Sequence, residues 1–470
     1  MSLIFDPPVR PEDLAARRVT IVGLGKGRTT AGLARFLVDV GARVTVSDAK
    51  PAAQLAEGIA RLGHLPVELR LGPSSDDAAL ADPDFVFVIP GVRPRSPTIT
   101  RAVARGIPVL TEMGLFLRLC PAPIVGVTGT KGKTTTTRLV GDILARGSRR
   151  VLVGGNIGTA VIQELPSLTR DHVVVLELSS FQLETLGRSP QVAVVTILDE
   201  DHLDHHGTRD AYAAAKRNIL AWQGPRDVAV LNLDDPAVVA MHTGVPSEVR
   251  GYSLQLRPRR GAQLDGDGVL CLIDGDRRRP LCAAGELRMP GRHNVGNALA
   301  AAVVGDAFDI PAEDIGSALR LFKGVPHRLQ PVGEADGVLW VDDSQATAPV
   351  ATVAALASYD RPAVAILGGV GKGTDFGVLA RALLSRARGA VLIGSSADEI
   401  ADAIARAEDD GRRILVERAE TLRDAVACAR AMARPGDVVL LSPACASFDM
   451  FASYEERGDQ FHSLVREFAG

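Results

Sequence analysis

Residues 123–137 read PIVGVTGTKGKTTTT and join an apolar run to a loop of glycine, threonine and lysine. The apolar run is typical of a buried β-strand, and residues 134–147, TTTTRLVGDILARG, have the pattern of a helix. A strand that delivers glycine-rich backbone to a helix N-terminus points several N–H groups at one concavity, where they bind phosphate. The stretch therefore predicts an α/β domain with a nucleotide-phosphate site.

This loop departs from the ordinary phosphate-loop spacing. Val127 stands where the pattern has its first glycine, and Gly126 lies one residue too early. The shorter unit GTKGKT, residues 129–134, is intact. We expect the Lys133 ammonium to reach the terminal phosphates and the Thr134 hydroxyl to bind Mg²⁺. A turn without a ligand is the alternative, but strand, glycines, Lys-Thr and helix together favour a nucleotide.

Acidic partners follow two further apolar runs. Glu177 lies at the end of HVVVLELS, and residues 199–206, DEDHLDHH, follow QVAVVTIL. Carboxylates and imidazoles beside a phosphate loop suit a divalent cation that bridges phosphate oxygens. A solvated, charge-rich loop is the alternative interpretation of residues 199–206.

The first hundred residues alternate predicted strands and helices. RRVTIVG, ARVTVSD and DFVFVIPG are expected strands, and residues 28–40 are an expected helix. The loop after the first strand resembles the pattern GxGxxG, but Arg28 occupies the third glycine position. Asp48 ends the second strand, where an acidic residue could meet a ribose. An NAD-dependent dehydrogenase, a non-redox nucleotide fold and a plain tight turn all remain open at this point.

Four short apolar strands, VLWVDDS, AVAILGG, GAVLIGS and DVVLLSP, alternate with helical stretches after Gly324. The chain is thus predicted to form three consecutive α/β domains. We expect a Rossmann-like domain at residues 1–111, a central phosphate-loop ATPase domain at 112–324 and a Rossmann-like domain at 325–470.

Composition excludes several classes of protein. With 46% hydrophobic and 23% charged residues and a formal charge of −3, the 470-residue chain is expected to be globular and cytoplasmic. That charge disfavours a general nucleic-acid binder, and no apolar run predicts membrane insertion. Five cysteines without a CxxC pair favour neither a disulfide framework nor a zinc site. Only seven of the 53 Lys and Arg residues are lysines. Because arginine supplies the positive charge elsewhere, we expect these lysines to mark sites that need a compact ammonium or a reactive amine.

A series of motifs resembles those of the Mur ligases, which form amide bonds in peptidoglycan precursors. The order and spacing of these motifs match along essentially the whole chain. They are GTKGKTTT, GGNIG (154–158), LELSSFQLE (176–184), EDHLD (200–204), AAKRN (214–218), GRHNVGNALAA (291–301), GVPHR (324–328), DDSQAT (342–347) and SPACASFDMF (442–451).

The segments SPACASFDMF and ELSSFQLE resemble the family members that add D-glutamate to UDP-N-acetylmuramoyl-L-alanine. The resemblance implies these two substrates, ATP, two Mg²⁺ sites, an acyl-phosphate intermediate and a monomeric enzyme. Three other functions remain open: a different phosphate-loop ATPase or kinase, a dehydrogenase, and a non-catalytic UDP-sugar-binding protein. Phosphate release that depends on D-glutamate would separate them.

The resemblance also assigns roles to residues by motif. For catalysis it implies Lys133, Lys216, His202, Glu177 and His327. The implied metal ligands are Thr134, Glu177, His202 and a carbamylated Lys216. For ATP it implies Thr130, Lys131, Gly132, Lys133, Thr134, Thr135, Thr136, Asn294, Arg328 and Asp343. For the UDP substrate it implies Gly25, Lys26, Gly27, Asp48, Gly91, Asn156 and Ser179, and for glutamate Thr347, Lys372, Ser447 and Tyr454.

Two positions differ from the family pattern. Gln345 stands where the family usually has the lysine of Asp-Ser-Lys-Ala-Thr, so a cation is absent near the expected glutamate site. Ile197 stands where an asparagine is expected before EDHLD.

Overall fold

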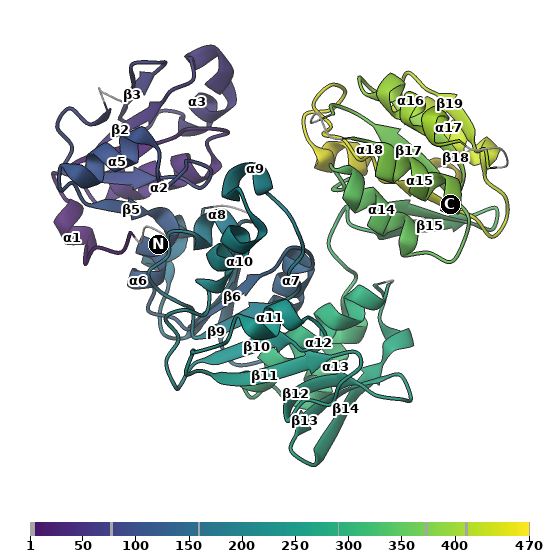
Figure 1. Ribbon diagram of the computed structural model, residues 1–470, viewed down its shortest axis with the longest axis horizontal. Helices are drawn as coiled ribbons and strands as arrows, with labels where there is room; N and C mark the ends of the chain where they lie inside the picture. The colour runs from purple at the N-terminus through teal and green to yellow at the C-terminus, as the bar shows by residue number, and fades with distance from the viewer. Residues whose placement is uncertain are drawn as a thin grey trace. The chain divides into compact units, whose positions relative to one another are not determined.

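The computed structural model describes residues 5–75, 79–157, 160–289, 291–371, 375–408 and 412–469. It contains three β-sheets, each combined with helices, which confirms the predicted three α/β domains (Figure 1). The chain divides into two compact units. Unit 1 comprises residues 1–286 and 295–320, and unit 2 comprises residues 287–294 and 321–470.

The first sheet of unit 1 has five parallel strands in the order β3-β2-β1-β4-β5. Because the order reverses between β1 and β4, the loops after these two strands border the crevice where such sheets bind ligands. The strands are β1 (Arg18–Val22), β2 (Arg43–Asp48), β3 (Val67–Leu71), β4 (Phe85–Val88) and β5 (Val109–Thr111). The helices are α1 (Pro11–Leu14), α2 (Arg28–Asp39), η1 (Ala52–Leu55), α3 (Ala56–Leu62) and α5 (Pro97–Ala104).

The second sheet has nine strands in the order β14-β13-β12-β11-β10-β9-β6-β8-β7, and only the β12-β13 and β13-β14 pairs are antiparallel. Strand β6 lies between β8 and β9, so the segments that follow all three strands meet at one edge. The strands are β6 (Ile124–Thr128), β7 (Arg150–Gly155), β8 (His172–Glu177), β9 (Val192–Val195), β10 (Val228–Asn232), β11 (Glu248–Ser253), β12 (Arg260–Leu264), β13 (Val269–Asp274) and β14 (Arg277–Ala283).

The helices of this part of the chain connect the strands and close the core. They are α6 (Glu112–Leu119), α7 (Lys133–Leu144), η2 (Val161–Ser167), α8 (Ser180–Leu183), α9 (Leu203–His206), α10 (Arg209–Arg217), α11 (Pro236–Ala240), η3 (Ala284–Glu286), α12 (Arg292–Ala307) and α13 (Ala312–Leu321). One buried apolar cluster contains Leu33 of α2, Phe116 of α6 and Ile162 of η2, so the cores of the first two sheets are continuous.

The third sheet, in unit 2, has the order β15-β16-β20-β17-β18-β19, and only β15 runs antiparallel to its neighbour. Successive residues of β17 alternate between two apolar clusters, with Ala365 in one and Ile366 in the other, because both faces of this parallel sheet are covered. The strands are β15 (Gln330–Ala335), β16 (Val338–Asp342), β17 (Ala363–Gly368), β18 (Ala387–Ile393), β19 (Leu415–Arg418) and β20 (Val438–Leu441). The helices are α14 (Pro349–Ala357), α15 (Gly377–Arg386), α16 (Ala397–Ala407), α17 (Leu422–Met432) and α18 (Tyr454–Ala469).

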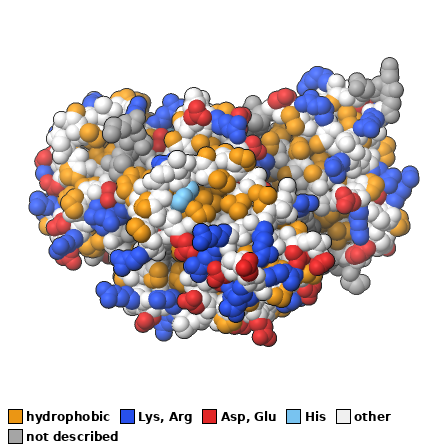
Figure 2. Space-filling model, turned by 60° about the horizontal axis from the view of Figure 1, so that its bottom comes forward, with side chains coloured by type: hydrophobic (Ala, Val, Ile, Leu, Met, Phe, Trp, Pro, Cys, Tyr) orange, Lys and Arg blue, Asp and Glu red, His pale blue; other side chains and the backbone are white. Residues whose placement is uncertain are grey.

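None of the helices in the described ranges combines the length and the apolar character needed to cross a bilayer. On the face seen in Figure 2, acidic and basic side chains are intermingled among apolar and neutral ones.

Candidate functional site

The loop between β6 and α7 has the backbone of a phosphate-binding loop. Gly129 (φ +145°) and Gly132 (φ +84°) adopt positive φ angles that side chains rarely allow, and Gly132 immediately precedes α7. A Cβ at Gly129 would collide with the Thr196 hydroxyl, and one at Gly132 would collide with Asn297. Both glycines are therefore required by conformation and by close approach, and they leave the α7 N-terminus open to an anion.

The side chains of this loop are held by neighbours after β9 and in α10. Thr130 Oγ1 donates to the Asp199 carbonyl at 3.0 Å and lies 3.1 Å from the Tyr212 hydroxyl. Lys131 Nζ lies 3.4 Å from Asp199 Oδ2. Thr135 is buried, and Thr136 Oγ1 donates to Asn297 Oδ1 at 3.3 Å.

Glu177, at the end of β8, has both carboxylate oxygens engaged at the edge of the phosphate loop. Thr134 Oγ1 donates to Oε2 at 2.6 Å, and Asn156 Nδ2 donates to Oε1 at 2.9 Å. Glu177 is only 3% exposed. A carboxylate and a hydroxyl oxygen side by side next to a phosphate loop are a donor set that fits Mg²⁺.

Two lysine amines meet at the Gly129 carbonyl. Lys133 Nζ donates to it at 3.0 Å and also to the Thr130 carbonyl at 3.0 Å. Lys216 Nζ donates to the same Gly129 oxygen at 2.8 Å and lies 4.7 Å from the centre of the Tyr212 ring. Burial, reinforced by the Lys133 ammonium, lowers the pKa of Lys216 to about 7. A neutral, nucleophilic amine is thus accessible to Lys216 near neutral pH.

His202 lies on the segment after β9 with a left-handed backbone (φ 51°). Its Nε2 is 3.5 Å from Asp201 Oδ2, and its ring is 4.9 Å from that of Phe181. Among the described residues, no hydrogen bond or ion pair joins His202 to Glu177 or Lys216. The structure therefore brings together Thr134 and Glu177 from the predicted metal set, while His202 has other neighbours.

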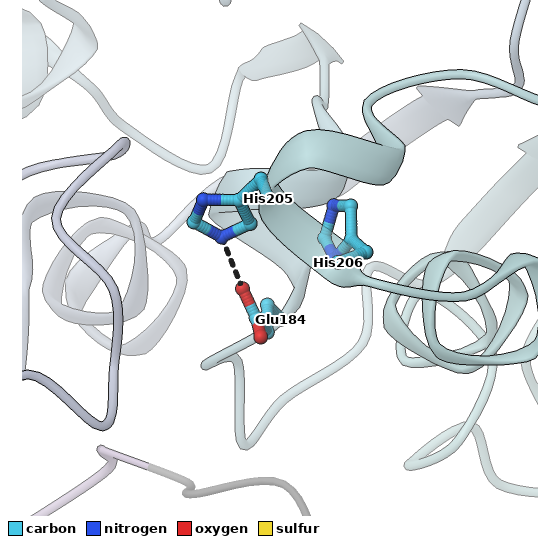
Figure 3. A group of neighbouring side chains, drawn as sticks. All are labelled: Glu184, His205 and His206. Carbon is cyan, nitrogen blue, oxygen red and sulfur yellow. Dashed lines mark hydrogen bonds and ion pairs between the residues drawn. The ribbon is translucent and has the colours of Figure 1, made fainter.

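A second group of possible metal ligands comprises Glu184, which directly follows α8, and His205 and His206 of α9 (Figure 3). His205 Nε2 is 3.0 Å from Glu184 Oε2, and His206 Nε2 is 3.0 Å from Ser180 Oγ. Ser179, predicted to contact the UDP substrate, accepts a hydrogen bond from Gln182 N and so caps α8. Glu184 and His205 also line a small pocket with Ile89, Gly91, Glu112 and Phe181.

The predicted UDP-binding residues of the first sheet lie at its carboxyl edge. Gly25 and Gly27 have positive φ, and a Cβ on Gly27 would meet the backbone of Gly58. Asp48 Oδ2 accepts hydrogen bonds from Leu24 N at 2.8 Å and Gly25 N at 3.2 Å, so this carboxylate shapes the glycine-rich loop. Lys26 is part of the same loop, and Gly91 follows β4 with φ +98° and open space around it.

Arg28 connects this sheet to the second one, since its Nη2 donates to the Asn156 carbonyl at 3.0 Å. The position that breaks the GxGxxG pattern is therefore a contact to the segment bearing Asn156. This contact explains why arginine, and not glycine, occupies the third glycine position of the pattern.

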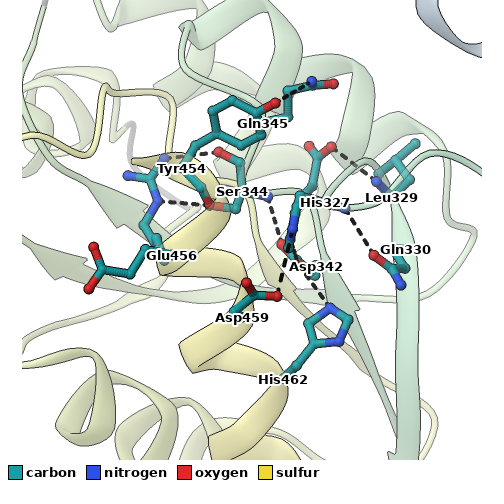
Figure 4. A network of polar contacts seen from close by, with 12 residues as sticks. His327, Leu329, Gln330, Asp342, Ser344, Gln345, Tyr454, Glu456, Asp459 and His462 are labelled. Carbon is teal, nitrogen blue, oxygen red and sulfur yellow. Dashed lines mark hydrogen bonds and ion pairs between the residues drawn. The ribbon is translucent and has the colours of Figure 1, made fainter. Parts of the chain in front are cut away.

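In unit 2, several predicted residues gather where β16 ends (Figure 4). His327 has a left-handed backbone (φ 59°) and its Nδ1 lies 2.7 Å from Asp342 Oδ2. Gln345 Nε2 donates to the Tyr454 hydroxyl at 3.3 Å, so the residue that replaces the family lysine contacts a predicted glutamate-binding residue.

Asp343 is buried and accepts hydrogen bonds from Ser442 Oγ at 2.7 Å and Leu329 N at 3.1 Å. Burial raises the pKa of Asp343 to about 7. Arg328 is close enough to oppose this rise electrostatically. Asn294 and Ser447 are buried, Thr347 is partly buried, and Lys372 lies outside the described residues.

Arg457 of α18 is fully buried and joins three segments around this network. Its guanidinium donates to Ser344 Oγ and Ser344 O, both at 2.9 Å, to Cys445 O at 3.3 Å and to Gly368 O at 3.4 Å. The end of β17 and the segments after β16 and β20 are thus held by one side chain.

Sequence reasoning did not identify several residues of these sites. Asn297 and Tyr212 contact the phosphate loop, and Asp342 and His462 surround His327. Asn297 had a signal, because it lies three residues after Asn294 in GRHNVGNALAA and so faces the same side of a helix. His462 had none, since it lies far along the chain from every motif it contacts.

Three family descriptions match consecutive parts of the chain. "Mur ligase MurD-like, N-terminal domain" matches residues 17–111, "Mur ligase middle domain" matches 127–305, and "Mur ligase, glutamate ligase domain" matches 327–445.

Two curated relatives are similar over nearly their full length. The chain is 44% identical to the UDP-N-acetylmuramoylalanine--D-glutamate ligase of Pelotomaculum thermopropionicum, covering 97% of this chain and 98% of that protein. It is 42% identical to the protein of the same name from Symbiobacterium thermophilum, covering 95% and 97%.

Solved structures share the fold. The UDP-N-acetylmuramate-alanine ligase MurC of Thermotoga maritima is similar with a TM-score of 0.59 and 21% identity, covering 96% of this chain and 99% of that one. MurF of Acinetobacter baumannii is similar with a TM-score of 0.58 and 17% identity, covering 95% and 93%. At these identities the likeness concerns the arrangement of helices and strands.

Proposed function

The chain belongs to the Mur ligase family, and from this premise we propose that it joins D-glutamate to UDP-N-acetylmuramoyl-L-alanine in the synthesis of a peptidoglycan precursor. It is an ATP-dependent ligase, as the family is. The observation that carries the proposal is the assembly at one sheet edge of a phosphate loop, the Thr134–Glu177 pair and the buried Lys216. The identity of the two joined substrates rests on the relatives' names.

An amide bond between a free carboxylate and an ammonium is uphill in water, so the carboxylate must be activated. The L-alanine carboxylate would attack the γ-phosphorus of ATP, forming an acyl phosphate and breaking the bond to ADP. The neutral amine of glutamate would then attack the acyl carbon, and the tetrahedral intermediate would expel phosphate. No nucleophile of the enzyme is needed for this sequence.

The residues of the phosphate loop would stabilise the charge that builds up on the transferred phosphoryl group. Lys133 would exchange its bonds to the Gly129 and Thr130 carbonyls for phosphate oxygens. Thr134 and Glu177 would hold Mg²⁺, with His202 and Lys216 as the further ligands that the family resemblance implies. When bound, this cation would neutralise phosphate oxygens.

Lys216 would act as a carbamate in this proposal. Its nearest polar partners are a carbonyl, at 2.8 Å, and the Thr128 hydroxyl, at 3.4 Å, and it shares that carbonyl with Lys133. Two ammonium groups on one oxygen repel each other. Loss of a proton from the Lys216 ammonium would give the neutral amine, which would attack CO₂ and lose a second proton. An anion would then stand in place of one of the two cations, which would relieve that repulsion.

Substrate binding follows the residues assigned by motif. Gly25, Lys26, Gly27, Asp48, Gly91, Asn156 and Ser179 would bind the UDP substrate. Asn294, Arg328 and Asp343 would bind the nucleotide, and Thr347, Lys372, Ser447 and Tyr454 would bind glutamate. We place the domain limits at 1–111, 112–324 and 325–470, and propose a monomeric, cytoplasmic enzyme.

Phosphate release in the presence of ATP and UDP-N-acetylmuramoyl-L-alanine, with and without D-glutamate, tests the proposal. We expect sustained release only when all three substrates are present, and an equal amount of amide product. Release that ignores D-glutamate would indicate a different ATPase, and no release under any condition would refute the ligase activity.

A further inference from the structure

The backbone of His327 is held by hydrogen bonds on both sides. Its backbone N donates to Gln330 Oε1 at 2.9 Å, and its carbonyl accepts from Gln345 N at 3.0 Å. Its left-handed φ of 59° is uncommon for a residue other than glycine. Backbone conformations of this kind persist where the surroundings over-determine them, which is frequent at functional sites.

The imidazole of His327 faces a buried carboxylate on one side. Asp342, at the end of β16, is 0% exposed and its Oδ2 lies 2.7 Å from His327 Nδ1. The other nitrogen, Nε2, points toward the exposed Asp459 of α18, whose Oδ1 is 3.8 Å away. Asp342 therefore determines which nitrogen of His327 is directed outward (Figure 4).

Asp342 has a second imidazole beside it. His462 Nε2, from α18, lies 2.9 Å from the same Oδ2, and Ser344 N donates to Oδ1 at 2.8 Å. Burial alone would raise the pKa of Asp342, but its contacts with His327, His462 and Ser344 lower it below the usual range. The contacts thus keep this buried carboxylate ionised, as an orienting anion must be.

The helix α18 is shaped to admit His327. Gly458 lies in its second turn, and a Cβ there would collide with His327 Nδ1 and approach Asp342 Oδ2 to 2.7 Å. Glycine in a helix interior is unfavourable by about 1 kcal/mol relative to alanine, so its presence needs a packing reason. Here that reason is the direct contact between the imidazole and the helix backbone.

We propose that Asp342 and His462 are positioning residues that hold His327 with Nδ1 bound and Nε2 presented to the reacting groups. That Nε2 of His327 faces the reacting groups rests on the proposed ligase function. That Asp342 and His462 hold His327 in place does not depend on it. The arrangement matches the common device in which a carboxylate fixes the tautomer of a functional histidine. His462 contributes by fixing Asp342, without contacting substrate.

The charges around His327 give the proposal a measurable consequence. The hydrogen bond with Asp342 raises the pKa of His327, and Asp459 and Glu455 act in the same direction while burial opposes them. Tyr454 and His462 are the other titratable groups whose rings pack within about 6 Å, at 6.2 and 5.9 Å. Loss of the Asp342 charge should therefore lower the pKa of His327.

The first experiment is NMR titration of ¹⁵N-labelled histidines in the full chain, with His327 assigned from a His327→Gln variant. In the parent protein we expect neutral His327 to carry its proton on Nδ1. In Asp342→Asn we expect a lower pKa of His327, because the neighbouring negative charge is lost, and a mixture of tautomers. An unchanged pKa and tautomer in Asp342→Asn would overturn the proposal.

The second experiment compares His462→Gln with His462→Leu in steady-state kinetics. The amide nitrogen of Gln can still approach Asp342, whereas Leu cannot. We expect Leu to lower kcat roughly 10- to 100-fold, the range of losses for groups that orient a functional ligand, and Gln to retain most of it. KM for ATP should change less than threefold in both, and Gln460→Ala, an exposed change on the same helix, should match the parent enzyme.

Three outcomes would contradict the proposal in distinguishable ways. Equal kcat for both His462 variants would show that the contact is only structural. Stoichiometric zinc in the purified protein, lost in Asp342→Asn, would show that the His327–Asp342–His462 group is a metal site. Full activity of His327→Gln would overturn the positioning role in catalysis while leaving D-glutamate-dependent phosphate release, and hence the ligase function, intact.

Discussion

Lys133 and Lys216 show how single residues of this chain are specialised. Both amines donate to the Gly129 carbonyl, yet one extends from the start of α7 and the other from within α10. Lys216 is 1% exposed, whereas Lys133 is partly exposed. The same residue type therefore stands in two different environments, and substitutions can test the separate roles proposed for the two lysines.

Lys133→Ala should abolish turnover while leaving the protein folded. The change removes the ammonium that we propose to bind phosphate oxygens but leaves the glycines that shape the loop. We expect kcat to fall by at least 10²-fold, the range for the loss of one group that stabilises developing charge. Phosphate release measures it, and circular dichroism checks the fold. Near-parental turnover in a folded variant would refute the nucleotide role of this loop.

Lys216→Ala should be nearly inactive, and short carboxylic acids should partly restore it by filling the anionic position. Lys216→Arg should also be inactive, because a guanidinium does not form a carbamate and stays positive. The measurement is kcat over a series of acetate and formate concentrations. An active Lys216→Arg enzyme would contradict the carbamate, since it would show that only a positive charge is wanted.

At the scale of elements, the start of α6 carries a buried carboxyl group. Glu112 is 4% exposed, and its Oε1 accepts a hydrogen bond from Ile162 N of η2 at 3.2 Å. Burial raises the pKa of Glu112 to about 7. This group joins a helix that follows the first sheet to a segment of the second, so it couples their packing to pH.

The direction of that coupling follows from the raised pKa. The folded state holds the Glu112 proton more tightly than the unfolded state, so the contribution to stability is complete below about pH 4.5 and is lost as pH rises to about 7. A shift of that size corresponds to about 3 kcal/mol.

Glu112→Gln keeps an acceptor for Ile162 N but cannot ionise. Between pH 5 and pH 8 we expect the unfolding free energy of unit 1 to fall more in the parent than in this variant, by about 2–3 kcal/mol. Urea unfolding of both proteins at the two pH values measures this difference. The contributions of all other titrating groups are the same in both proteins and cancel in the comparison. An equal fall in both proteins would show that Glu112 is not protonated in the fold.

Helix α18 offers a second test at this scale. Gly458→Ala improves helix propensity by about 1 kcal/mol but places a methyl group against His327. We expect kcat to fall about tenfold or more, because a collision at this position moves His327 and small misplacements are costly. Steady-state kinetics and a thermal unfolding curve measure both effects. A more stable and fully active variant would show that the collision is absorbed elsewhere.

Several of the strands that sequence analysis did not identify share one feature. β3, β5, β7, β15 and β19 each lie at an edge of their sheet. An edge strand has one neighbour and is often partly exposed, as in β19, where all four residues are exposed. It therefore lacks the continuous apolar run by which buried parallel strands such as β6 and β17 are found.

At the scale of the whole molecule, the chain should prefer D-glutamate to L-glutamate as acceptor. The two carboxylates of glutamate need donors at a fixed separation, and inversion at the α-carbon moves a carboxylate or the amine off its partner. Loss of one charge-assisted hydrogen bond costs about 1.5–3 kcal/mol, roughly ten- to more than a hundredfold in rate. Parallel product formation with each enantiomer at equal concentration measures the preference.

Gln345 makes this prediction informative, because it replaces a cation near the expected acceptor site. Its amide donates to the Tyr454 hydroxyl, so the position keeps a hydrogen bond but not a charge. We expect the affinity for glutamate to be weakened by this change and the preference for the D form to persist. A preference for the L form would overturn the specificity and leave the fold and ATP chemistry in place.

By itself the sequence determined the three α/β domains, the phosphate loop and the pairing of that loop with Glu177. These features depend on local patterns: apolar runs, glycines at a strand end, and a carboxylate that ends a neighbouring strand. Tertiary structure alone decided that Asn297 would pack against Gly132, that Lys133 and Lys216 would share one carbonyl, and that His462 would reach Asp342. Each of these contacts joins residues that are distant in the chain. The residues meet only because the order of the strands and the packing of the helices bring them together, and the sequence around each residue does not reveal its partner.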